Sequence, residues 1–83
     1  MSRVGTMAIA FCKQADSLLE LQRYEGAIEL YKKALQVDPN HFLSLHNMGR
    51  ALHMLGRFDE AVDFYEKAGR ANPSESSSFH NIG

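Results

Sequence analysis

Apolar side chains recur three and four positions apart through most of the chain, as on one face of a helix. Across residues 42–68 the pattern runs in two segments of helical length, which a polar break at Gly56 separates. Proline removes a backbone amide and disfavours helix in the preceding residue, so Pro39 and Pro73 are each predicted to follow the end of a helix. No stretch alternates with the period of two that a half-buried strand needs. The pattern predicts an all-α fold made of helical hairpins.

The hydrophobic pattern also repeats along the chain. The stretch LHNMG at Leu45–Gly49 returns as FHNIG at Phe79–Gly83, a shift of 34 residues. A fixed period of this size is typical of stacked arrays, in which each unit buries its apolar face against its neighbours. The other identical or similar pairs under this shift are Leu18 with Leu52, Leu21 with Leu55, Arg23 with Arg57, Tyr24 with Phe58, Ala27 with Ala61, Ile28 with Val62, Tyr31 with Tyr65, Lys33 with Lys67, Ala34 with Ala68 and Pro39 with Pro73.

These residues resemble the tetratricopeptide repeat. The second unit carries the family's pattern nearly whole. The first unit matches it less closely, because Gln14, Ala15 and Gln22 replace an apolar residue and two glycines that are usual at their positions. The matching residues of the first unit are Phe11, Ala15, Leu18, Tyr24, Ala27, Tyr31, Ala34 and Pro39. Those of the second unit are Leu45, Met48, Gly49, Leu52, Gly56, Phe58, Ala61, Tyr65, Ala68 and Pro73.

The resemblance implies a right-handed α-solenoid of antiparallel helix-turn-helix repeats, with two 34-residue units and the first half of a third. We divide the chain into an N-terminal extension at residues 1–7, unit 1 at residues 8–41, unit 2 at residues 42–75 and a truncated first helix of unit 3 at residues 76–83. Arrays usually need about three units, so we expect a fragment of a longer array.

Small side chains in unit 2 indicate where its helices cross. Gly49, Ala61 and Ala68 are expected at the close approach of the two helices, where larger side chains would push them apart. Phe58 and Tyr65 are expected to fill the space beside these small residues.

Composition and charge narrow the function. The 83 residues hold nine Lys and Arg against ten Asp and Glu, with no basic run, which argues against nucleic acid as a partner. Cys12 is the only cysteine, so an internal disulfide is impossible, and a reducing compartment fits. The apolar run near the N-terminus is too short to span a membrane and makes a poor secretory signal. We therefore expect a cytoplasmic protein that does not bind membranes.

The family generally holds peptides or protein segments in a concave groove, which the first helices of successive units line. By position, the resemblance places nine residues along this groove. They are Cys12, Asp16, Glu20, His46, Asn47, Arg50, His53, His80 and Asn81. Asn47 and Asn81 occupy a position where many members place an asparagine that bonds a peptide backbone, although water could equally be the partner of such an amide.

One subfamily clamps the terminal carboxylate of chaperone tails with Lys, Asn and Arg side chains. Here the positions of that clamp hold Cys12 and Asp16 in unit 1, and Ser77 and Asn81 in unit 3, so only Asn47 matches. Because Asp16 would repel a carboxylate, we expect no meaningful binding of chaperone tails.

The sequence offers weak candidates for metal binding and for catalysis. His46 and His53 share a helical face, but Arg50 lies between them and would repel a cation, so surface imidazoles are the simpler interpretation. A nucleophile needs a base within reach, and Cys12 with His46 is the only imaginable pair. We expect no enzyme activity, no metal and no cofactor.

The sequence thus predicts a protein-interaction module with a groove for a peptide or protein segment of unknown identity. The apolar face of helix 59–70 should be poorly covered, which predicts self-association, by stacking of the repeat ends or by exchange of helices. The alternative state is a frayed monomer in which residues 76–83 cover enough of this face. The alternative is a structural spacer in a larger scaffold, with no ligand in its groove.

Overall fold

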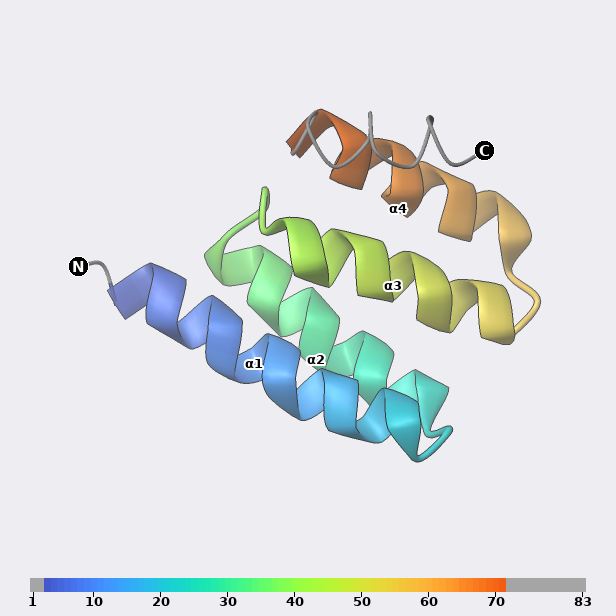
Figure 1. Ribbon diagram of the computed structural model, residues 1–83, viewed down its shortest axis with the longest axis horizontal. Coiled ribbons are helices and arrows are strands. Elements are labelled where there is room, and N and C mark those ends of the chain that lie inside the picture. Colours follow the sequence, from blue (N-terminus) through green and yellow to red (C-terminus); the bar gives the residue numbers. More distant parts are fainter. Residues whose placement is uncertain (1–2, 72–83) are drawn as a thin grey trace.

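The computed structural model describes residues 3–71, and these residues form four α-helices joined by short turns. The helices are α1 at Arg3–Glu20, α2 at Tyr24–Val37, α3 at Phe42–Met54 and α4 at Phe58–Ala71. Successive helices run antiparallel, so that α1 and α3 point in the same direction (Figure 1). There is no strand in this part of the chain, and the all-α prediction is confirmed.

The helices pair as the sequence pattern predicts. α1 packs on α2 and α3 packs on α4, while α2 and α3 join the two hairpins. α1 begins at Arg3, so it includes part of the segment that we assigned to the extension at residues 1–7. The predicted unit 3 at residues 76–83 lies outside the described residues. The bounds of the units and the right-handed solenoid stay predictions.

The turns of the two hairpins have the same geometry, although one of them lacks glycine. The amide of Arg23 donates to the carbonyl of Leu18 at 2.8 Å, and the amide of Arg57 donates to the carbonyl of Leu52 at 2.9 Å. Each turn needs a left-handed residue just before the donor, which closes the helix end in the manner of a Schellman motif. Gly56 takes this conformation at φ 81°, and Gln22 takes it at φ 63°. The first turn therefore carries backbone strain that the second avoids.

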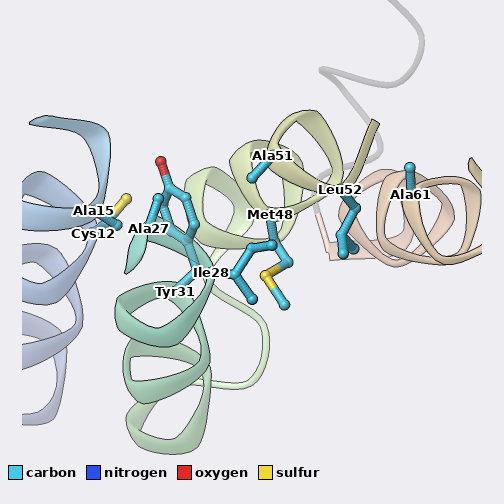
Figure 2. Close-up of a cluster of buried hydrophobic side chains, with 9 residues drawn as sticks. All are labelled: Cys12, Ala15, Ala27, Ile28, Tyr31, Met48, Ala51, Leu52 and Ala61. Carbon is cyan, nitrogen blue, oxygen red and sulfur yellow. The ribbon is translucent and has the colours of Figure 1, made fainter. Parts of the chain in front are cut away.

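A single apolar core runs through all four helices (Figure 2). Most of its side chains are small or aliphatic, and Tyr31 is the largest side chain that is fully buried. The Tyr31 ring lies between the helices in Figure 2, with its hydroxyl directed away from α2. The buried members are Cys12 and Ala15 of α1, Ala27, Ile28 and Tyr31 of α2, Met48, Ala51 and Leu52 of α3, and Ala61 of α4.

The close approach of α3 and α4 occurs at Gly49, as predicted. A Cβ atom added to Gly49 would lie 2.8 Å from Cδ1 of Tyr65, which is closer than real Cβ contacts allow. Ala61 and Ala68 are buried on the facing helix. The prediction for Phe58 is wrong, because its side chain is 56% exposed. Phe58 instead pairs with the His53 ring in a T-shaped arrangement, with the ring centroids 5.1 Å apart.

The two hairpins differ in how well their second helices are covered. Ile28 of α2 is 4% exposed, because α3 packs over it, whereas its equivalent Val62 of α4 is 52% exposed. α4 buries only Ala61 and Ala68, whereas α2 buries four residues. The outer face of α4 is therefore the least covered apolar face among the described helices.

Candidate functional site

One carboxylate joins three helices at the centre of the molecule. Oδ1 of Asp16 in α1 accepts a hydrogen bond from the hydroxyl of Tyr31 in α2. The same oxygen accepts a hydrogen bond of 2.9 Å from the side-chain amide of Asn47 in α3. Burial raises the pKa of Tyr31 well above its usual value, and the hydrogen bond to Asp16 and the charge of Asp16 raise it further. The arrangement satisfies a buried phenol and a buried amide with a single acceptor.

Cys12 lies beside this network and is chemically protected. Its side chain is 3% exposed. Burial raises the pKa of the Cys12 thiol, which the hydrogen bond to Ser44 offsets in part. Ser44 is fully buried, and its hydroxyl also bonds Nδ1 of His41 at 2.6 Å. A nucleophilic cysteine needs an accessible thiolate, so this environment does not favour one.

His46 lies within a group of aromatic rings. Its ring stacks on Phe42 with the centroids 5.8 Å apart, and it meets Tyr65 at 5.5 Å with the planes tilted. Tyr65 also lies directly over Gly49, so this ring packs between α3 and α4. The half-buried His46 thus contributes to packing as well as to the surface.

A depression lies between the end of α1, the start of α2 and the end of α3. Its volume is about 280 Å³. Arg50 and His53 supply basic groups, two tyrosines supply hydroxyls, and aliphatic side chains supply the remaining wall. The lining residues are Leu19 of α1, Tyr24 of α2, Arg50, His53 and Met54 of α3, and Tyr65 of α4. The depression therefore offers hydrogen-bond donors in a partly apolar setting.

The predicted groove residues differ in how far the structure buries them. Cys12 and Asn47 are buried, and the amide of Asn47 is already committed to Asp16. These two residues therefore offer little surface to a partner. Glu20, Arg50 and His53 are exposed, while Asp16 and His46 are half-buried. The structure brings only Arg50 and His53 together in the depression. His80 and Asn81 lie outside the described residues.

Several residues of the site were not singled out for it from the sequence. Four of them carry hydroxyls that hold the network or line the depression, namely Tyr24, Tyr31, Ser44 and Tyr65, and Leu19 and Met54 supply apolar wall. One signal was available, because Tyr31 and Tyr65 are equivalent under the 34-residue shift, and so are Asp16 and Arg50. Ser44 gives no such signal.

Residues 3–71 contain neither a candidate metal centre nor a candidate membrane span. In this range no three His, Cys, Asp or Glu side chains are grouped so that they could hold a metal ion. No helix in the same range has both the length and the apolar character needed to cross a membrane.

Comparison with known families decides the identity of the fold. A family model described as the tetratricopeptide repeat matches residues 6–73, which is most of the chain. The chain belongs to the tetratricopeptide repeat family. No curated protein is similar enough to the chain to count as a match. Tetratricopeptide repeats generally mediate protein–protein interactions, and they are typically scaffolds without catalytic activity.

Proposed function

We propose that this tetratricopeptide chain holds a peptide segment along the surface that α1 and α3 share. The observation that carries the proposal is the depression near the end of α3, which joins Arg50 and His53 to the side chains of three other helices. Ligand sites are typically concave, partly apolar and supplied with a few polar groups that orient the ligand. The depression has each of these properties.

The binding would depend on shape complementarity and hydrogen bonds, without a covalent step. Glu20, Arg50 and His53 are the exposed members of the predicted groove in the described residues. Asn47 would support the groove from beneath, because its bond to Asp16 holds α3 against α1. In this proposal Asn47 positions the groove, and the exposed side chains contact the peptide.

A peptide screen followed by nuclear magnetic resonance tests the proposal. The chain is incubated with an array of random acetylated decapeptides, and the best binder is titrated into ¹⁵N-labelled protein. We expect shifts at the amides of Glu20, Arg50 and His53, and none at Glu29 or Lys33, which are exposed on α2. Failure of every peptide to bind would favour the structural spacer instead.

We further propose that the outer face of α4 is covered by a second copy of the chain. This face carries Phe58 and Val62, both more than half exposed, and a shallow hollow lined by Val62, Tyr65 and Gly69 among others. On α2 the equivalent apolar residue Ile28 is covered by a helix of the next hairpin. The repeat geometry therefore supports a helix as the covering element.

Light scattering coupled to size-exclusion chromatography tests this second proposal. We expect a dimer or a larger assembly that persists on dilution, and a monomer for Val62→Asp, because a charge would then have to be buried. Leu21→Asp changes an apolar residue that is even more exposed, at the turn between α1 and α2, and it should keep the assembly. A wild-type monomer at every concentration would contradict the proposal.

A further inference from the structure

The two hairpins place opposite charges at equivalent positions. Asp16 in α1 and Arg50 in α3 correspond under the 34-residue shift, as do Tyr31 in α2 and Tyr65 in α4. In the first hairpin the carboxylate of Asp16 accepts the hydrogen bond of the Tyr31 hydroxyl. In the second hairpin this carboxylate is replaced by a guanidinium. At these positions the first hairpin has a hydrogen-bond donor and its acceptor. The second hairpin has two donors, Arg50 and Tyr65.

These donors have no acceptor within residues 3–71. Neither the Arg50 guanidinium nor the Tyr65 hydroxyl forms a hydrogen bond or an ion pair with another described residue. Arg50 and Tyr65 nevertheless line the same depression. Burial raises the pKa of Tyr65, and the charge of Arg50 offsets this in part. An arginine and a phenol that line one depression suit a carboxylate, which accepts two or more hydrogen bonds at once.

The surroundings favour a carboxylate on a side chain. Arg50 and Tyr65 both line the depression of about 280 Å³, together with His53, which can donate a further hydrogen bond. Leu19, Met54 and the ring of Tyr24 supply apolar wall for the methylene groups of an acidic side chain. The hollow is therefore complementary to an acidic side chain in both charge and polarity.

We propose that Arg50 and Tyr65 bind the side-chain carboxylate of a glutamate or aspartate in the peptide that the groove holds. The inference rests on the proposed function, because it names the chemistry of that partner. The site differs from the clamp for terminal carboxylates, since neither residue occupies a position of that clamp. The partner is accordingly an acidic peptide segment.

An array of peptide pools tests the inference. Random acetylated decapeptides carry Glu, Gln or Lys at one fixed position, and they are tethered through their C-termini so that no terminal carboxylate is present. We expect the Glu pools to retain the chain most strongly. For a Glu peptide in solution, Arg50→Gln should weaken binding about tenfold or more, because hydrogen bonds to charged groups are the stronger ones.

Two further variants separate the carboxylate site from general effects of charge and packing. Tyr65→Phe keeps the ring over Gly49 and removes only the hydroxyl, so affinity for the Glu peptide should fall about threefold or more. Lys33→Gln removes the same charge as Arg50→Gln from an exposed position on α2, and it should leave the preference for Glu intact. Circular dichroism checks that each variant is folded.

The possible outcomes distinguish this inference from the proposed function. Equal binding of the Glu and Gln pools, or a preference that survives Arg50→Gln, would overturn the carboxylate site and leave the groove in place. Soluble peptides that bind with a free C-terminus but not when amidated would overturn it in favour of terminal recognition. Failure of every pool to bind would overturn both proposals.

Discussion

The side-chain amide of Asn47 donates a hydrogen bond of 2.9 Å to the carboxylate of Asp16, which connects α3 to α1 across the two hairpins. α1 and α3 touch each other much less than neighbouring helices do. Tyr31 bonds the same oxygen from α2, so the carboxylate ties together elements that apolar packing joins less directly. The relative position of the two helices that would line the groove therefore depends on a polar contact.

Removal of this acceptor should destabilise the chain. Asp16→Ala leaves the buried hydroxyl of Tyr31 and the buried amide of Asn47 without their acceptor, and an unsatisfied buried group costs about 1 to 3 kcal/mol. Because two groups lose their acceptor, we expect the free energy of unfolding in urea to fall by at least that amount. Asp63→Ala, at an exposed position on α4, is the control and should change it by less than about 0.5 kcal/mol.

A double-mutant cycle with Tyr31→Phe identifies the origin of this loss. If the unpaired phenol contributes, Asp16→Ala should cost less in the Tyr31→Phe background, because no hydroxyl is then left without an acceptor. Costs that simply add would show that the hydrogen bond in the structure does not contribute to stability.

Alkaline pH should weaken the fold through Tyr31. Burial raises the pKa of this phenol in the folded chain, and its hydrogen bond to Asp16 raises it further, whereas an unfolded tyrosine titrates near pH 10. Folding therefore favours the protonated phenol, and its contribution is complete below about pH 10 and is lost as the pH rises above that value. Urea unfolding between pH 8 and 11 should show a smaller decline for Tyr31→Phe than for the wild-type chain. Parallel declines would refute the assignment to Tyr31.

The turn between α1 and α2 should gain stability from glycine. Gln22 has φ 63°, a conformation that costs a residue with a Cβ atom about 1 kcal/mol or more. Glycine adopts it without this cost, although the unfolded chain then has more freedom to lose. We expect Gln22→Gly to raise the free energy of unfolding by about 0.5 to 1 kcal/mol. The reverse change at the equivalent position, Gly56→Ala, should lower it by a similar amount.

Alanine at Gly49 should force α3 and α4 apart. The new methyl group would lie 2.8 Å from the Tyr65 ring, and overpacking of this kind costs about 1 to 3 kcal/mol. Thermal unfolding should show a clear drop in the midpoint. Gly26→Ala is the matched control, because the added methyl meets only the end of the Leu18 side chain at 3.2 Å and alanine favours helix. A loss of stability in Gly26→Ala as large as that in Gly49→Ala would contradict the packing argument.

The sequence was sufficient for the helices, their pairing and the close approach at Gly49. Helical periodicity and the 34-residue shift carry this information directly, because both follow from which positions must be apolar or small. The shift also shows that Gln22 stands where the second hairpin has Gly56. The sequence was not sufficient to predict the exposure of Phe58. The repeat pattern shows which positions are equivalent, but it does not show in which unit a neighbouring helix covers such a position.

The candidate site was harder to predict, and the reason is specific. The family resemblance places Asn47 along the groove, but it cannot show that the side-chain amide bonds Asp16. A third helix takes part as well, since the Tyr31 hydroxyl of α2 bonds the same carboxylate oxygen. Cys12 is buried for a similar reason, because Ser44 packs against its thiol from the next hairpin.

The sparse burial of α4 has a consequence for how the chain opens. Local unfolding is easiest where few apolar side chains are buried, and α4 buries only Ala61 and Ala68. Its amide hydrogens should therefore exchange with solvent faster than those of α2, while the rest of the fold stays intact. A molecule that binds the outer face of α4 would raise the free energy of this local opening and would therefore slow the exchange. The last described helix would then report whether that face is occupied.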